Sequence, residues 1–423
     1  MAKKIEAIRL GDLVKITSGG TPSKEIKTNW GGDMPWISAS SMKQKLLNNS
    51  ALKLTEQGIN NGGRLAETGD VLLLVRGSEL HNSIPVGIAT RRVAYNQDIK
   101  ALRCSNAICS EFLYYWLKAM ESDLLSKVES TGIGAGKIDT EILKGLKILL
   151  PERELQAVIA SQFKALDDKI ELNRQMNETL EQMAKALFKS WFVDFDPVHA
   201  KAAGRQPAGM DKATADLFPD SFADSELGKI PKGWRIGALG EIATNPRRGM
   251  QPEDIAPGTP YIGLEHMPRR SIALGEWEDS IVVESGKSGF KKGEILFGKL
   301  RPYFHKVGIA PMDGVCSTDI LVLAPVSQAW FGPLLSYASS DELIQFTNLA
   351  STGTKMPRTN WRDVSSFKII IPTHELADGY SKIISSLTAK IAQNLSQSKT
   401  LSATRDALLP RLIGDRQFIE ARK

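Results

Sequence analysis

One glycine-rich segment of this sequence has the composition of a phosphate-binding loop, Gly132-Ile133-Gly134-Ala135-Gly136-Lys137-Ile138. A Walker A loop needs a glycine five residues before its Gly-Lys pair and a Ser or Thr directly after it. Its backbone N–H groups then cradle the phosphates, and the hydroxyl binds Mg²⁺. Here Thr131 occupies the first position and Ile138 the last. The match fails at both ends, so we predict no nucleotide-binding loop.

Other catalytic patterns are equally incomplete. Pro219-Asp220 with Glu226 and Lys229 loosely resembles a nuclease metal site, but the Glu–Lys spacing is wrong and the segment lies in a connector. No Asn-Pro-Pro-Tyr-like tetrad, which would serve base methylation, is present. We therefore expect no catalytic residue and no metal site in this chain, although an enzyme with a site dispersed along the sequence stays an open alternative.

Charge and cysteine usage limit the class of protein. A net charge of +6 and a pI of about 9.0 suit a polyanionic partner without proving one, because many proteins are basic. The three cysteines, Cys104, Cys109 and Cys316, form an odd and sparse set that fits reduced thiols in the cytoplasm. The start lacks the apolar core of a signal peptide, and no apolar run reaches the ~20 residues of a membrane span.

The chain repeats itself when it is shifted by 221 residues. Val86-Gly87-Ile88-Ala89 then falls on Val307-Gly308-Ile309-Ala310, and Ser130-Thr131-Gly132 falls on Ser351-Thr352-Gly353. Upstream, Gly69-Asp70-Val71-Leu72 resembles Gly293-Glu294-Ile295-Leu296 at a slightly different offset. So long a period indicates duplicated domains. Because the copies differ most at surface-like loops, one scaffold should bind two versions of the same kind of ligand.

Each copy begins with a mixed α/β domain, at residues 8–150 and 234–371. Short apolar runs bounded by Gly and Pro, such as Val71–Val75 and Ile369–Ile371, are typical of buried strands. A helix is expected from Ser110 to Ser122, with a counterpart that begins near Phe331.

A long helix follows each domain. From Glu152 to about Phe192 there is no Gly or Pro, and apolar residues recur at heptad spacing. A surface helix packed on its own domain is the alternative, but we favour pairing because each copy offers the other a matching seam. The predicted pairing residues are Ile159, Leu166, Asn173, Leu180 and Leu187 in the first helix and Tyr380, Leu387, Asn394, Leu401 and Leu408 in the second.

The predicted seams have Asn173 and Asn394 at their midpoints. Antiparallel pairing would bring both into one buried central layer, and the intervening domain must return the chain to start the second helix. Residues 193–233 are expected to form an extended connector with a few anchors.

The order of these elements, together with several local motifs, resembles the specificity (S) subunit of type I restriction–modification enzymes over essentially the whole chain. The motifs are Gly19-Gly20-Thr21-Pro22-Ser23, Ala186-Leu187-Phe188-Lys189-Ser190-Trp191-Phe192-Val193-Asp194-Phe195-Asp196-Pro197, Leu227-Gly228-Lys229-Ile230-Pro231-Lys232-Gly233-Trp234 and Leu408-Leu409-Pro410-Arg411-Leu412-Ile413. This resemblance implies target-recognition domains at 1–150 and 234–371, spacer helices at 151–192 and 372–413, a connector at 193–233 and a tail at 414–423. The helices would form an antiparallel coiled coil, and the whole chain an internal pseudo-twofold repeat.

The resemblance also implies partners and the location of chemistry. Such a subunit reads a bipartite, asymmetric site on double-stranded DNA and joins two modification (methyltransferase) subunits and two restriction subunits. S-adenosylmethionine would bind the modification subunit, and ATP and Mg²⁺ the restriction subunit, so this chain itself would hold no cofactor. The specificity subunit of a fused cleavage–methylation system is one alternative, and a two-domain protein-binding scaffold is another.

Phosphate contacts would supply affinity and base-edge contacts specificity, with Arg and Lys suited to guanine and Asn and Gln to adenine. Each candidate could instead be a solvated surface residue. The aromatics expected to dock the modification subunit are Trp191, Phe192 and Phe195. The candidate DNA-binding residues are Thr21, Ser23, Lys24, Arg76, Ser78, Arg91 and Lys137 in the first domain, and Arg247, Arg248, Gln251, Lys299, Arg301, Lys355 and Arg358 in the second.

Overall fold

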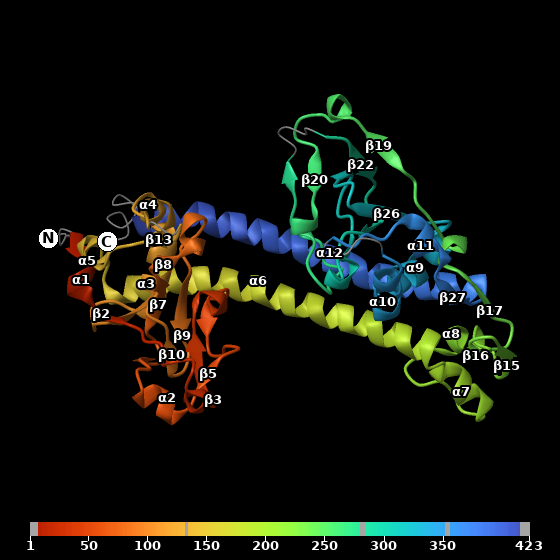
Figure 1. Ribbon diagram of the computed structural model, residues 1–423, viewed down its shortest axis with the longest axis horizontal. Helices are drawn as coiled ribbons and strands as arrows, with labels where there is room; N and C mark the ends of the chain where they lie inside the picture. Colours follow the sequence, from red (N-terminus) through yellow and green to blue (C-terminus); the bar gives the residue numbers. More distant parts are fainter. Residues whose placement is uncertain (1–6, 132–133, 280–284, 352–355, 415–423) are drawn as a thin grey trace. The chain divides into compact units, whose positions relative to one another are not determined.

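The computed structural model describes residues 7–131, 134–279, 285–351 and 356–414. Contacts divide the chain into two units, one of residues 1–169 with 401–423 and one of residues 170–400. Each unit holds one α/β domain and part of both long helices (Figure 1). No described helix is long and apolar enough to cross a membrane.

The two long helices begin and end close to where the sequence predicts. Helix α6 spans Arg153–Phe188 and continues as a π-helical turn, Lys189–Val193. Helix α12 spans His374–Leu409 and ends in a second π turn, Pro410–Gly414. The predicted fold class, mixed α/β domains with two long helices, is confirmed.

The two larger sheets of the first domain have strand orders β2-β11-β7-β9-β4 and β5-β3-β10-β6, beside two smaller sheets, β1-β14 and β12-β13-β8. In the second sheet β3 and β10 run parallel, while most other neighbours are antiparallel. Its elements are β1 (Ala7–Arg9), α1 (Leu10–Leu13), β2 (Val14–Ser18), β3 (Trp30–Ile37), β4 (Leu46–Leu47), β5 (Lys53–Leu54), α2 (Glu56–Asn60), β6 (Leu65–Ala66), β7 (Val71–Leu74), β8 (Arg76–Gly77), η3 (Ser78–His81), β9 (Val86–Ala89), β10 (Val93–Tyr95), β11 (Ile99–Cys104), α3 (Ser110–Ala119), α4 (Glu121–Ser126), β12 (Glu129–Ser130), β13 (Gly136–Lys137), α5 (Thr140–Gly145) and β14 (Lys147–Leu149).

The second domain repeats this topology. Its sheet β18-β26-β23-β24 has the order of β2-β11-β7-β9, and β21-β20-β25-β22 has that of β5-β3-β10-β6, parallel pair included. Its elements are β17 (Arg235–Ala238), β18 (Ala243–Thr244), β19 (Arg248–Met250), η6 (Pro252–Asp254), β20 (Pro260–Ile262), β21 (Glu278–Asp279), β22 (Lys287–Phe290), β23 (Ile295–Gly298), η8 (Pro302–Phe304), β24 (Val307–Ile309), β25 (Gly314–Cys316), β26 (Ile320–Pro325), α9 (Phe331–Ala338), α10 (Asp341–Ala350), α11 (Trp361–Ser366) and β27 (Lys368–Ile371).

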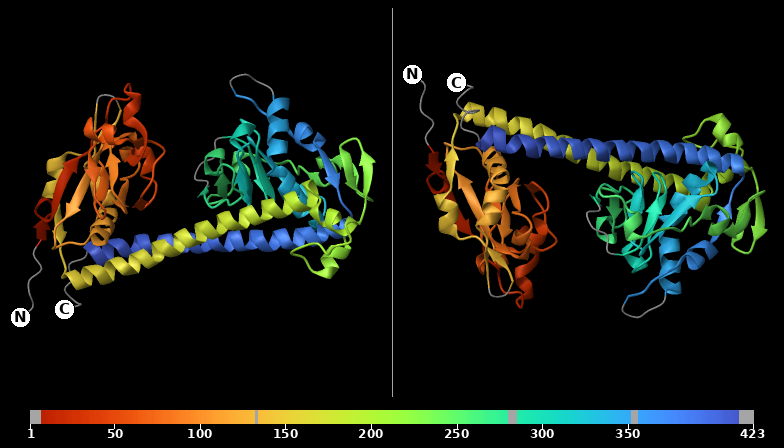
Figure 2. Two further views of the ribbon diagram at one scale, coloured as in Figure 1. Left: turned by 90° about the horizontal axis from the view of Figure 1, so that it is seen from below. Right: turned by 90° about the horizontal axis from the view of Figure 1, so that it is seen from above.

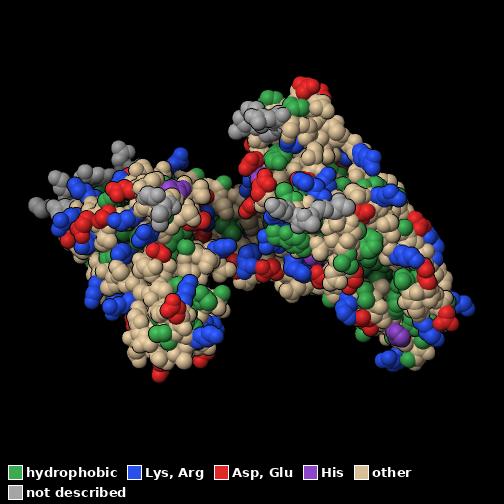
Figure 3. Space-filling model, in the orientation of Figure 1, with side chains coloured by type: hydrophobic (Ala, Val, Ile, Leu, Met, Phe, Trp, Pro, Cys, Tyr) green, Lys and Arg blue, Asp and Glu red, His purple; other side chains and the backbone are tan. Residues whose placement is uncertain are grey.

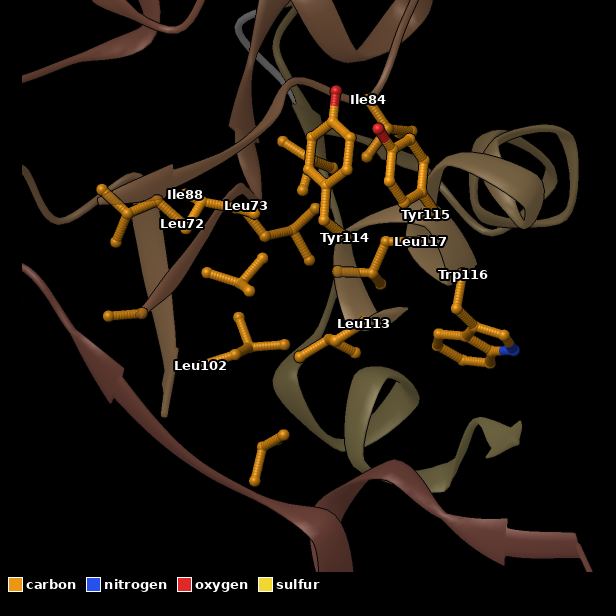
Figure 4. Packing of buried hydrophobic residues seen from close by; sticks show 14 of the residues in the cluster. Leu72, Leu73, Ile84, Ile88, Leu102, Leu113, Tyr114, Tyr115, Trp116 and Leu117 are labelled. Atoms are coloured by element: carbon orange, nitrogen blue, oxygen red, sulfur yellow. The ribbon is translucent and has the colours of Figure 1, made fainter. Parts of the chain in front are cut away.

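The core of the first domain lies between its strands and α3. All four residues of β7 are fully buried, as the unbroken apolar run predicts. Figure 4 shows Leu72 and Leu102 from the strands packed with Leu113 and Leu117 of α3. Each such leucine contributes about 1.5–3 kcal/mol of transfer free energy, so the loops at the domain surface rest on a firm scaffold.

Within each unit the long helices pack antiparallel (Figure 2). In the first unit, Ile159 and Phe163 of α6 share a core with Leu409 at the far end of α12, and Leu166 and Leu408 pack against it. In the second unit, Tyr380 near the start of α12 is fully buried beside Trp191 and Phe192. The remaining predicted seam leucines, Leu180, Leu187, Leu387 and Leu401, are partly buried.

The central asparagines are buried, but their side chains do not pair with one another. Asn173 donates to the Asn394 backbone oxygen at 3.4 Å, to Gln397 Oε1 at 3.0 Å and to Ser398 Oγ at 3.2 Å. The Asn394 amide instead donates to Asn177 Oδ1 at 2.8 Å. The side-chain partner of Asn394 is therefore Asn177, one helical turn from the predicted position.

The connector is more structured than predicted. It forms α7 (Asp196–Ala202), α8 (Lys212–Asp216) and a hairpin of β15 (Phe222–Ser225) and β16 (Gly228–Pro231). The predicted docking residues Trp191, Phe192 and Phe195 are only 3%, 2% and 8% exposed, in a cluster with Phe218 and Trp234. The docking prediction was wrong, because these aromatics form the core beneath the connector and offer no surface to a partner.

Candidate nucleic-acid interface

Two predicted cations and one predicted hydroxyl of the first domain lie together at one tip: Arg76, Lys137 and Ser78. Strand β8 pairs with β13, which places Arg76 directly opposite Lys137, and Ser78 follows in η3. The tip is tied to the domain because Val75 donates to the Asp98 backbone oxygen and Ile138 donates to the Val75 backbone oxygen. Arg76 and Ser78 line a hollow of about 730 Å³. We call this pair of strands, with η3, the first tip.

A second loop carries Thr21, Ser23 and Lys24, which are all exposed. Two tryptophans fix its backbone: Trp36 Nε1 donates to the Gly20 oxygen and Trp30 Nε1 to the Ser23 oxygen, each at 3.1 Å. The Thr21 hydroxyl donates to Gln97 Oε1.

The remaining candidate of the first domain, Arg91, lies in the exposed turn between β9 and β10. Among the described residues, Lys24, Arg76 and Arg91 have no ion-pair partner, so their charges face solvent.

The second domain builds the same tip from different residues. Leu300 bridges to Arg358, the Arg301 backbone N–H donates to the Pro357 oxygen at 2.7 Å, and Thr359 donates to the Lys299 oxygen. Arg358 holds Asp319, with Nε at 3.0 Å from Oδ1. This ion pair raises the pKa of Arg358, which is a cation in any case. We call residues 299–304 with 356–359 the second tip. Lys355 lies outside the described residues.

Arg247 and Arg248 are neighbours in sequence but differ in environment. Arg248 forms a two-pronged ion pair with Glu294, at 2.7 and 2.8 Å, and Glu294 is buried. Arg248 therefore helps to hold the domain together, and its predicted role in DNA binding stays a prediction. Arg247 is exposed and lines a hollow of about 260 Å³ with Lys299. Gln251 is exposed at the start of η6.

The first domain has a corresponding internal ion pair that uses another strand. Arg103 on β11 binds Asp70 through two bonds, at 2.9 and 2.8 Å, and Asp70 precedes β7 as Glu294 precedes β23. Both carboxylates also accept a backbone N–H from the turn before them. The acidic residue thus belongs to the framework, whereas the arginine that neutralises it differs between the domains.

A basic hollow of about 350 Å³ in the first domain was missed by the sequence analysis. Lys15, Thr17, Arg64 and Tyr95 line it together with Arg103. Burial raises the pKa of Tyr95, so its hydroxyl stays protonated beside Thr17 Oγ1 at 2.8 Å. Polar Lys15 and Thr17 alternate with apolar Val14 and Ile16 along β2. This period of two in the sequence could have revealed that Lys15 and Thr17 share one face of a strand.

On the face shown in Figure 3, Lys and Arg side chains alternate with Asp and Glu on both units. No group of three or more His, Cys, Asp or Glu in the described part of the chain could hold a metal ion. Loops of exposed cations and hydroxyls on a rigid scaffold can bind phosphates and base edges.

Comparisons with known proteins agree with this arrangement. A family model described as "Type I restriction modification DNA specificity domain" matches residues 2–182. The MjaIX specificity subunit of Methanocaldococcus jannaschii is 26% identical over 96% of this chain and 91% of its own length. The HindI specificity subunit of Haemophilus influenzae is 28% identical over 73% of this chain and 78% of its own length.

A solved structure supports the fold over the whole chain. The S subunit of a type I restriction–modification system from M. genitalium superposes with a TM-score of 0.56, covering 97% of this chain and 96% of that one at 16% identity. At this identity the likeness shows the fold alone. It therefore extends to the second domain and α12, which the family model does not reach.

Proposed function

Because this chain belongs to the type I restriction–modification DNA specificity family, we propose that its two domains read the two halves of one split, asymmetric DNA site. The observation that carries the proposal is the pair of tips, which share backbone pairing but present different side chains. The first tip offers Arg76, Ser78 and Lys137, and the second offers Arg301, Tyr303 and Arg358. Two domains that share a backbone framework but present different side chains are suited to two half-sites of different sequence.

Affinity would come from exposed lysines and arginines on phosphates, and specificity from the tips in the major groove. Half-sites read from one face of the duplex should lie about one helical turn, ~34 Å, apart. The long helices would set this spacing, because each contributes to both units. The basic hollow around Lys15 and Arg64 is suited to a phosphate of the first half-site.

We further propose that the chain recognises sequence without catalysis of its own. Its partners would be two modification subunits, which bind S-adenosylmethionine, and two restriction subunits, which use ATP and Mg²⁺. This division of labour is supported by the incomplete phosphate loop at 131–138. The proposed site of action is the cytoplasm, which the three free cysteines and a role on chromosomal DNA support. Native mass spectrometry of the co-expressed complex tests the count of partners, and a single modification subunit at saturation would contradict it.

Methylome sequencing tests the proposal directly, in a host that carries the modification subunit with and without this gene. We expect a split, asymmetric motif with an unspecified gap that appears only when the gene is present. A continuous palindromic motif would contradict the proposal. A scaffold that binds only proteins would give no new motif and no salt-dependent binding to duplex DNA.

A matched pair of variants assigns the first tip. Arg76→Ala with Lys137→Ala should weaken DNA binding by the complex and lower the salt dependence by about one counterion per lost phosphate contact. Lys144→Ala serves as the control, because Lys144 is an exposed cation on α5 that pairs with Glu141 at 2.7 Å. Equal effects of both changes would show that only net charge matters.

A further inference from the structure

Arg301 stands where the first domain has a glycine. Gly69 matches Gly293 and Gly77 matches Arg301, both 224 residues later. Gly77 has a φ of 145° and faces Gly136 across the first tip, and the N–H of Arg301 binds the oxygen of Pro357, the counterpart of Gly136. Both residues therefore have a positive φ at this position of the tip, which glycine adopts freely.

The positive φ of Arg301 comes at a cost, and its backbone conformation differs from that of Gly77, whose ψ is 167°. Arg301 has a φ of 51° and a ψ of 65°, in the left-handed region that residues with a Cβ rarely occupy. Pro302 follows directly and begins η8. Glycine would fit this backbone position without strain. The presence of an arginine here is therefore best explained by a role of its side chain.

The side chain of Arg301 lies near an aromatic ring, but its guanidinium makes no hydrogen bond within the described chain. Its guanidinium carbon lies 6.0 Å from the Phe304 ring centre, and its Nε is buried without a hydrogen-bond partner among the described residues. Arg358 and Arg248 nearby are both neutralised, by Asp319 and Glu294. Within the described chain Arg301 is thus the tip arginine whose donors are unused, beside the half-exposed Tyr303.

We propose that Arg301 reads a guanine of the second half-site, donating two hydrogen bonds to its O6 and N7 in the major groove. This inference rests on the proposed function and names a specificity-determining residue for it. A planar guanidinium matches the guanine edge with two parallel bonds. A phosphate contact would need only a mobile charge, which the exposed Arg247 already supplies at this end of the domain. The fixed backbone and the aromatic neighbour favour base reading.

The test uses the complex of this chain with its modification subunits and three variants. Arg301→Gly restores the residue of the first domain, and Arg301→Lys keeps the charge but loses the two-pronged geometry. Arg270→Gly is the control, because Arg270 is another arginine of the same domain with positive φ, 59°, and it pairs with Asp341 at 3.0 Å. The probes are duplexes with the wild-type motif and duplexes in which each G·C pair of the second half is changed to A·T.

Arg301→Gly should lose preference for guanine at one position of the second half-site, by about 10- to 100-fold. Arg301→Lys should lose only part of it, because lysine also donates to guanine but without the planar, two-pronged geometry. The first half-site should be unchanged. Arg301→Gly should also raise the melting temperature by about 2 °C through relief of strain. Arg270→Gly should match that gain and keep the full motif.

Three results would overturn the inference. A loss of affinity in Arg301→Gly that is the same for every duplex would indicate a phosphate contact, and an unchanged affinity and motif in Arg301→Gly would show that the side chain reads nothing. A melting temperature lowered by Arg301→Gly would assign Arg301 a structural role. Failure of the proposed function is separate, because the wild-type complex would then show no split motif at all.

Discussion

The two domains rest on the long helices through different chemistry. In the first unit Lys45 Nζ donates to the Tyr115 hydroxyl at 2.6 Å, and that hydroxyl donates to Asp167 of α6 at 2.6 Å. Arg405 of α12 binds the other Asp167 oxygen at 2.8 Å. One carboxylate therefore ties the domain and both helices together. Burial lowers the pKa of Lys45, although Asp167 partly compensates.

The second unit replaces this polar cluster with apolar packing. Ile272 takes the place of Lys45, because its oxygen accepts from Ile309 as the Lys45 oxygen accepts from Ile88. It lines a largely apolar hollow of about 600 Å³ along α12. Glu181 of α6 accepts from Ser271 Oγ at 2.6 Å and from the Ala273 backbone at 3.2 Å. The comparison teaches that the framework fixes where a domain sits on its helices, while the contacting residues can change.

Removal of the shared carboxylate should have the largest effect. Asp167→Ala would remove the ion-pair partner of Lys45, which is only 14% exposed, and would leave Arg405 paired with Asp406 alone. We expect a loss of about 3 kcal/mol in the free energy of unfolding, measured by urea denaturation. Asp168→Ala is the control, since Asp168 is exposed and its one ion-pair partner among the described residues is Lys164. Equal losses in both variants would contradict the polar cluster.

The asparagine seam of the second unit is expected to have the next largest effect. Asn394→Leu would strand the buried Asn177 Oδ1 and cost about 2 kcal/mol. Asn177→Leu together with Asn394→Leu should recover that stability, because both amides of this hydrogen-bonded pair are then removed. The double variant should also loosen helix register and blur the gap between half-sites. A double variant as unstable as the single one would show that the seam needs the polar layer for stability.

Two equivalent histidines give the smallest expected effect. His305 is buried and its Nε2 donates to the Ser339 oxygen at 3.0 Å, whereas His81 is exposed. Burial lowers the pKa of His305 below its ordinary 6.5, while Asp341 raises it and Arg270 and Lys185 lower it. The unfolded chain then takes up a proton more readily. Stability is therefore complete above about pH 6.5 and falls as the pH drops toward the lowered value.

Thermal melts between pH 7.5 and 5 check this linkage. His305→Gln should remove this pH-dependent loss of stability, and His81→Gln is the matched variant at an exposed histidine. If the melting temperature of His305→Gln falls with pH as steeply as that of the wild type, another group causes the pH dependence.

Much of the framework could be predicted from the sequence. The heptad run without Gly or Pro determines α6, and the offset of 221 residues places α12. Local pattern does not reveal which long-range partner a side chain finds. Arg248 therefore looked free although Glu294 binds it, and Trp191 looked available although the folded connector covers it.

The strained arginine at the second tip was accessible to sequence reasoning. The match of Gly69 with Gly293 already fixed the offset that aligns Gly77 with Arg301. A glycine exchanged for a long cationic residue within a duplicated turn is a signal worth testing. What the sequence could not supply was the positive φ, which depends on strand pairing across more than fifty residues.

An exchange of residues 8–150 for the same region of a relative with a known, different motif tests the central claim most directly. Methylome sequencing of a host with the hybrid and the modification subunit is the readout. We predict that one half-site changes to that of the relative, while the other half and the gap stay as in the wild type. A well-folded hybrid in which both halves change together would contradict the account of two independent recognition domains.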